Sequence, residues 1–201
     1  MLRLLEQPET IKQAITVAYS KEKPTMRKNL LVRFVRFLSL TFGGLFAGFL
    51  VGVLVLESSL RHFDRSVYTQ VRQVELDRLD TLASVTLIPA LIATAILVGL
   101  AVKVRGRVFW LTLTALILLV SVFVTTLIFN LPINSDQVDW SVKAPPADWA
   151  SIRDRWQIAH AVRTCAAVLA FGCLSAAAMS KNAQSPQTSS NGSRLSQSSS
   201  Q

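Results

Sequence analysis

Four long apolar blocks constrain this chain more than any other feature of its sequence. They cover about residues 37–56, 83–102, 108–129 and 160–179. Coiled as an α-helix, each block is long enough to cross the hydrocarbon core of a bilayer. Only 16% of the 201 residues are charged and 51% are hydrophobic, which excludes a disordered chain and disfavours a soluble domain. The blocks therefore predict an all-α, polytopic membrane protein, built as a bundle of four transmembrane helices.

The polar segments at the two ends frame this membrane domain. Residues 1–36 are polar and basic, and we expect them to form a cytoplasmic segment before the four-span domain of residues 37–180. The sequence leaves open whether translation starts at Met1 or at Met26. Residues 181–201 are rich in Ser and Gln and contain no aromatic residue, a composition that predicts a disordered tail.

The charged connection between the first two spans shows a helical pattern. Val67, Val71 and Val74 recur there at the spacing of one helix face. The pattern predicts that residues 58–82 form a helix that runs into the second span, and not a loose loop.

A different structure is expected where the third span ends. Pro132 lies in the segment 130–134, and proline cannot donate the backbone hydrogen bond that would continue the helix. We therefore expect the third helix to stop there and residues 135–146 to be irregular. A last helix is expected from Ala147 to about Met179.

Basic residues are concentrated on one side of the predicted membrane. The N-terminal segment, the turn at residues 103–107 and the tail carry 13 of the 21 Lys and Arg residues but only 3 of the 12 acidic residues. The positive-inside rule then places both termini in the cytoplasm, and we expect a bacterial plasma membrane. The net charge of +9 fits segments that lie on the anionic surface of a lipid bilayer. The sequence has no basic stripe with base-stacking aromatic residues, so it does not indicate nucleic-acid binding.

Three glycines in the first span indicate close helix packing. Gly44, Gly48 and Gly52 are spaced four residues apart, which lets another helix approach closely. That helix belongs either to the same chain or to a second copy, so an intramolecular contact and a homodimer both remain open.

One face of the last helix carries the residues best suited to chemistry. At about 100° per residue, five aromatic, cationic and imidazole side chains fall within one arc: Trp149, Arg153, Trp156, His160 and Arg163. Each one alone also fits an ordinary role, as an interfacial tryptophan, a snorkelling arginine or a capping histidine. Histidine and arginine facing a bundle interior are costly unless paired, so their shared face favours a functional site.

Other polar residues on the same predicted side complete such a site. Asn130 and Asn134 supply amide donors and acceptors, and Glu57 at the end of the first span is the expected partner of Arg163. No metal-ligand spacing, glycine-rich phosphate loop or Cys-x-x-Cys occurs in the sequence. We therefore predict neither a metal nor a bound cofactor.

Two patterns in the chain match those of a known family. The first is Asn130-x-Pro132-x-Asn134, followed by Trp149-x3-Arg153-x2-Trp156-x3-His160-x2-Arg163-Thr164. The second is Tyr68-x-Gln-Val-Arg72-Gln-Val-Glu75, which precedes the second span. With these patterns the chain resembles, over roughly residues 37–180, the anthrone oxygenase-like family of small four-helix membrane proteins, long a domain of unknown function.

The resemblance implies a helical membrane bundle and, as in fungal members, the oxidation of an anthrone to an anthraquinone by O2 without an obvious cofactor. As a hypothesis, His160 is the general base that removes the carbon-bound proton, and Arg163 holds the developing enolate oxygen. The other candidates would bind the aromatic substrate: Asn130, Asn134, Trp149, Arg153, Trp156 and Glu57.

Two further functions stay open at this stage. One is a non-catalytic four-helix membrane scaffold or partner-binding subunit, for which the polar outer connections would be the docking surface. The other is a small transporter, which is disfavoured because no Asp or Glu lies within any predicted span.

Overall fold

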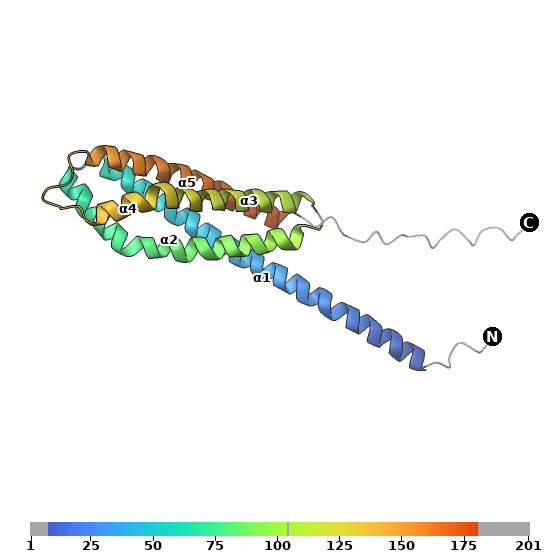
Figure 1. The fold of residues 1–201 in the computed structure, drawn as a ribbon. Coiled ribbons are helices and arrows are strands. Elements are labelled where there is room, and N and C mark those ends of the chain that lie inside the picture. The colour runs from blue at the N-terminus through green and yellow to red at the C-terminus, as the bar shows by residue number, and fades with distance from the viewer. Residues whose placement is uncertain (1–7, 104, 181–201) are drawn as a thin grey trace, which may run out of the picture.

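The computed structural model describes residues 8–103 and 105–180, and every regular element in that part of the chain is a helix. In chain order the elements are α1 (Pro8–Leu60), α2 (Arg65–Ala101), α3 (Arg107–Thr125), the π-helical turn η1 (Thr126–Asn130), α4 (Leu131–Val138) and α5 (Trp149–Met179). The long helices pack side by side in one elongated bundle, from which the first part of α1 projects (Figure 1). The predicted disordered tail, residues 181–201, lies outside the described residues.

Four helices are long and apolar enough to cross a membrane. They are Met26–Leu60 within α1, all of α2, Arg107–Val138 from α3 to α4, and all of α5. Many large apolar side chains on their outward faces are exposed, among them Ile92, Ile117 and Leu169. Such a surface is unfavourable in water, whereas lipid tails cover it readily. The chain is therefore an all-helical integral membrane protein with a four-helix bundle, as the sequence predicted.

The second helix is much longer than its apolar block requires. The Asp64 carboxylate caps its first turn by accepting hydrogen bonds from the backbone N–H groups of Ser66 and Val67, at 2.8 and 3.0 Å. From there α2 runs without interruption to Ala101. The prediction of a helix that leads into the second span is thus confirmed from Arg65 onward. Its first turns carry polar side chains beyond the apolar block.

The expected end of the third helix at Pro132 is wrong. The chain passes from α3 through η1 into α4 and stays helical to Val138. In η1 the N–H of Leu131 donates to the carbonyl of Thr126, five residues earlier, and Pro132 lies in the first turn of α4. A first-turn proline has no intrahelical hydrogen bond to lose. The wider turn therefore lets the helix continue past the proline.

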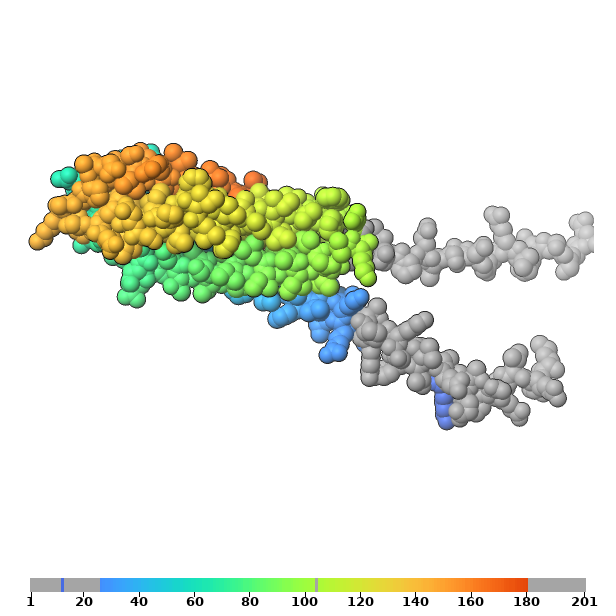
Figure 2. Space-filling model, viewed as in Figure 1, coloured from blue at the N-terminus to red at the C-terminus, as the bar shows by residue number. Residues whose placement is uncertain are grey.

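Small side chains let the helices of the bundle pack closely. The core contains Phe46 and Leu50 of α1, Leu119 of α3, and Ala167 and Ala170 of α5. In the space-filling view, α2 and α3 lie against each other along the visible face of the bundle (Figure 2). A core with this many alanines relies on close backbone approach more than on bulky side chains.

The glycines of α1 differ in what they face. A Cβ atom on Gly44 would lie 3.1 Å from the ring of Phe171, so Gly44 is where α1 and α5 come closest in this stripe. Gly48 and Gly52 have nothing within 4 Å. Gly44 thus serves an intramolecular contact, and a homodimer through Gly44, Gly48 and Gly52 stays a prediction.

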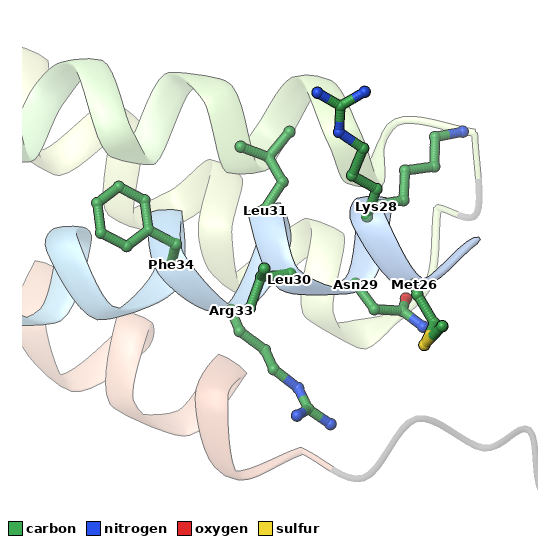
Figure 3. A pocket seen from close by; sticks show the side chains of 8 residues that line it. Met26, Lys28, Asn29, Leu30, Leu31, Arg33 and Phe34 are labelled. Carbon is green, nitrogen blue, oxygen red and sulfur yellow. The ribbon is translucent and has the colours of Figure 1, made fainter. Parts of the chain in front are cut away.

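Residues 26–36 of α1 lie at the end of the bundle and carry both apolar and basic side chains. Figure 3 shows Leu31 on one side of the helix and Arg33 on the other, with Phe34 one turn beyond Leu31. Leu31 and Phe34 are exposed, and Arg27 and Lys28 lie close by in the sequence. Apolar and basic side chains side by side are typical of a helix at the surface of an anionic membrane.

Candidate functional site

Polar side chains from four elements meet inside the bundle. The parts of the helices that carry them lie near the end opposite the projecting part of α1 (Figure 1). We refer to them as the polar cluster. Each member is at least nine-tenths buried. The cluster consists of Glu57 of α1, Arg72 and Glu75 of α2, Asn134 and Gln137 of α4, and Trp156, Gln157, His160 and Arg163 of α5. Buried charged groups are tolerated only when they are paired and hydrogen-bonded, so their contacts explain why the cluster persists.

Arg72 is the centre of the polar cluster. Its Nη1 donates to Glu75 Oε2 at 2.7 Å and lies 3.3 Å from Glu57 Oε1. Its Nε donates to Gln137 Oε1 at 2.8 Å, and its Nη2 donates to Asn134 Oδ1 at 2.6 Å. Every nitrogen of the guanidinium group is therefore used, and α1, α2 and α4 are tied together through this one side chain.

Trp156 lies between a cation and an imidazole. The Arg72 guanidinium carbon is 3.9 Å from the centroid of the indole, a cation–π contact. The His160 ring is stacked on the indole with 4.8 Å between centroids and 7° between planes. The indole Nε1 donates to Asn134 Oδ1 at 2.7 Å. The stack and the hydrogen bond hold Trp156 in one orientation.

The hydrogen bonds of His160 define its tautomer. Its Nδ1 accepts from Nε and Nη2 of Arg163, at 3.1 and 2.9 Å, so Nδ1 carries no proton. Its Nε2 lies 3.0 Å from the carbonyl oxygen of Leu50 and donates to it. Arg163 also donates from Nη1 to Thr126 Oγ1 at 3.2 Å. His160 is therefore neutral, and both of its nitrogens are engaged.

Glu57 has partners other than the one expected for it. It contacts Arg72, whereas Arg163 bonds to His160 and Thr126. The Oε2 atom of Glu57 accepts from Gln157 Nε2 at 3.0 Å. Glu57 is nevertheless fully buried within the polar cluster, so the end of the first span does belong to it.

The two outer members of the predicted ladder lie outside the polar cluster. Trp149 is half-buried and packs on Tyr68 with 5.5 Å between ring centroids. The guanidinium carbon of Arg153 lies 4.9 Å from the Trp149 ring, and its Nη2 pairs with Asp154 at 3.0 Å. These residues form a layer above the cluster, nearer the end of the bundle.

Asn130 supports the site from the π-helical turn. Its side chain is fully buried, and Nδ2 donates to the backbone carbonyl of Trp156 at 3.4 Å. Its Oδ1 has no hydrogen-bond partner. Asn130 therefore holds the backbone of α5 beside η1.

A small cavity of about 110 Å³ adjoins the polar cluster. Its polar walls include Arg72, Glu75, Asp80, Thr126, Asn134, Trp156 and Arg163. Ser84 of α2 and Leu131 of α4 also line it, and both are exposed, so the cavity reaches the side of the bundle between these helices. It is smaller than the roughly 300–1,000 Å³ of typical ligand pockets. A tricyclic aromatic molecule would fit only if α2 and α4 moved apart.

The structure thus unites Trp156, His160, Arg163, Asn134 and Glu57, and places Asn130 directly behind them. Sequence reasoning missed several participants: Arg72, Glu75, Asp80, Gln137 and Gln157. A signal for two of them was present, since Tyr68, Arg72 and Glu75 follow the spacing of one helix face. No three His, Cys, Asp or Glu side chains gather as metal ligands within residues 8–103 and 105–180.

The comparisons with known proteins point to one family. The sequence model of the family described as anthrone oxygenase matches residues 81–173, from the second half of α2 to the second half of α5. No curated protein and no solved structure matches the chain. The match includes Asn134, Trp156 and Arg163 of the cavity wall and His160 of the stack, whereas Arg72, Glu75 and Asp80 of the cavity wall lie outside it. Over residues 81–173, this membrane bundle is similar to the anthrone oxygenase family.

Proposed function

We propose that the polar cluster and its cavity form the active site of an oxygenase that acts on aromatic or other lipophilic substrates. The observation that carries the proposal is the buried Arg72–Trp156–His160 stack beside Arg163, at the wall of a cavity that reaches the side of the bundle. A lipophilic substrate dissolved in the bilayer can approach such a cavity without crossing water. The similarity of residues 81–173 to the anthrone oxygenase family supports the reaction class.

The reaction we propose balances with O2 as its only co-reactant. One proton leaves the acidic CH2 group of an anthrone, and the resulting carbanion is stabilised as an enolate. The carbanion forms a C–O bond with O2 to give a peroxide. Loss of the second proton from the same carbon breaks the O–O bond, so the products are a quinone and one water molecule. The substrate carbon is oxidised and O2 is reduced.

Arg163 and Asn134 are suited to bind the enolate oxygen, because both line the cavity. A fixed guanidinium group and an amide donor near a developing negative charge lower the barrier to its formation. Trp156 presents only the edge of its indole to the substrate, since the two faces of the ring are covered by Arg72 and His160. Asn130 and Glu57 act from behind by holding Trp156 and Arg72, and Trp149 and Arg153 cover the outer end.

His160 remains the proposed general base, with one condition set by the structure. Its Nδ1 lone pair is occupied by Arg163, so it can accept a proton only after Arg163 turns to the substrate oxygen. Binding of the enolate would thereby free the base. Trp156 lies between His160 and the cavity. For the substrate proton to reach His160, the indole ring must move or a water molecule must carry the proton. Such rearrangements between free and substrate-bound enzymes are common.

Oxygen uptake and quinone formation from a model anthrone in membranes test the proposal. We expect wild type to exceed empty membranes, since anthrones also oxidise spontaneously, and His160→Ala to fall by about 100-fold or more. His62→Ala is the matched control, because His62 is exposed and outside the cluster. Wild-type turnover no faster than empty membranes would refute the oxygenase proposal and favour a non-catalytic scaffold. Full turnover by His160→Ala would refute the base role alone.

We also propose that both termini lie in the cytoplasm of a bacterial plasma membrane. The concentration of basic residues at the termini and the 103–107 turn supports this orientation.

A further inference from the structure

Two buried carboxyl groups share a single cation in the polar cluster. Glu57 of α1 is fully buried and Glu75 of α2 is 5% exposed. Both contact the same nitrogen, Nη1 of Arg72, at 3.3 and 2.7 Å. Because both contact this one nitrogen atom, the two carboxyl groups lie close together. Two ionised carboxylates this close would repel each other strongly in a buried site.

The hydrogen bonds around the pair leave one oxygen of each carboxyl group without a donor. Oε2 of Glu57 accepts from Gln157, and Oε2 of Glu75 accepts from Arg72. Oε1 of Glu57 and Oε1 of Glu75 are both buried without a hydrogen-bond partner among the residues that the structure describes. A buried acceptor without a donor is destabilising. One proton held between the carboxyl groups supplies the missing donor and removes one of the two charges.

The neighbouring groups leave few other sources for that donor. Arg72 is fully used by Gln137, Asn134 and the pair itself. Tyr68 of α2 is bonded to Gln137, and Asp80 of α2 accepts from Asn134. On α5, Arg163 and His160 bond to each other, and Gln157 already serves Glu57.

We infer that Glu57 and Glu75 share one proton and that Glu75 delivers it to the peroxide oxygen formed in the cavity. The delivery of the proton by Glu75 rests on the proposed function, since it names the acid of that reaction. Glu75 lines the cavity and is the catalytic residue of the pair, whereas Glu57 is a positioning residue that keeps the proton on it. The peroxide anion takes the proton from Glu75 and becomes a hydroperoxide. The pair regains a proton when the second C–H bond of the substrate breaks. The O–O bond breaks at the same time, and the hydroxide that leaves takes the proton held by His160, so water forms and no net proton is gained or lost.

This division of roles gives the reaction both an acid and a base. His160 receives the first proton of the substrate, and the carboxyl pair donates to the oxygen that leaves as water. Arg72, which holds the carboxyl pair, contacts the indole of Trp156, and His160 stacks on the same indole. Arg72 and Trp156 therefore separate the acid from the base, so the carboxyl pair and His160 do not compete for one proton. Groups held in different protonation states are typical of sites that need acid and base catalysis together.

Infrared spectroscopy of the purified protein tests the shared proton without any substrate. We expect wild type to show the band of a protonated carboxyl group that shifts in D2O, and Glu75→Gln and Glu57→Gln each to lose it. Asp77→Asn is the matched control, because Asp77 is an exposed acid on α2 as well and pairs with the exposed Arg78. Glutamine can donate to the remaining carboxylate, so both variants should fold. Should one of them fail to accumulate, the other gives the same test.

Turnover of the model anthrone tests the delivery step. We expect Glu75→Gln to be at least about 100-fold slower than wild type and Asp77→Asn to be unchanged. Absence of the band in wild type, or its persistence in both glutamine variants, would overturn the shared proton. Wild-type turnover in Glu75→Gln would overturn its role as the acid. Inactive wild type with the band present would instead refute the proposed function and leave the shared proton established.

Discussion

Replacement of Arg72 by methionine is the sharpest test of how the polar cluster is stabilised. Methionine has a similar length but no charge, so the change removes the ion pairs to Glu57 and Glu75 and the cation–π contact with Trp156. Breaking a buried charge pair by deleting one partner costs about 3–5 kcal/mol, because the remaining charge is left unpaired. Gln137 Oε1 also loses its donor, a further cost of about 1–3 kcal/mol. We expect a loss of at least about 4 kcal/mol in the free energy of unfolding.

The assay is equilibrium unfolding in mixed detergent micelles, followed by the far-ultraviolet circular dichroism of the helices. Arg78→Met is the matched control: Arg78 is on the same helix, its side chain is 80% exposed, and its ion pair with Asp77 is worth at most about 1 kcal/mol. A triple variant that combines Arg72→Met with Glu57→Gln and Glu75→Gln should regain most of the loss, because no unpaired charge remains. The reasoning fails if Arg72→Met is within about 1 kcal/mol of wild type, or if the triple variant is no more stable than the single one.

Two smaller changes probe the packing and the stack. Gly44→Leu should destabilise the bundle by about 1–3 kcal/mol in the same assay, because a Cβ there already lies 3.1 Å from the Phe171 ring, whereas Gly48→Leu should be nearly neutral in the monomer; equal effects of the two would contradict this packing. Trp156→Phe keeps a ring for stacking but loses the 2.7 Å hydrogen bond to Asn134, so we expect a loss of about 1 kcal/mol and slower anthrone turnover. Unchanged turnover would show that the indole N–H has no part in positioning Asn134.

The spans were predictable because a bilayer imposes length and composition on any chain that crosses it. The face of α5 was also predictable, since residues on one helix keep a fixed angular relation whatever surrounds them. Trp156, His160 and Arg163 were therefore identified as a group. Arg72 and Glu75 were not, because a charged segment outside an apolar block reads as a solvated surface. Only the long, uninterrupted α2 brings them against α4 and α5.

The π-helical turn explains why the composition of this site was harder to predict than its location. A proline at residue 132 predicts a helix end, and a helix end would have exposed the segment that follows. The shift to five-residue hydrogen bonding at Leu131 keeps the chain helical instead, so that Asn134 and Gln137 lie on one buried face of α4. Both amides then accept hydrogen bonds from Arg72. An arginine in a charged connection becomes the centre of a buried cluster only because this local irregularity supplies two of its acceptors. Sequence periodicity cannot detect that dependence. Arg72 is separated from Asn134 by 62 positions and from Gln137 by 65, and the contacts depend on a single π-helical turn.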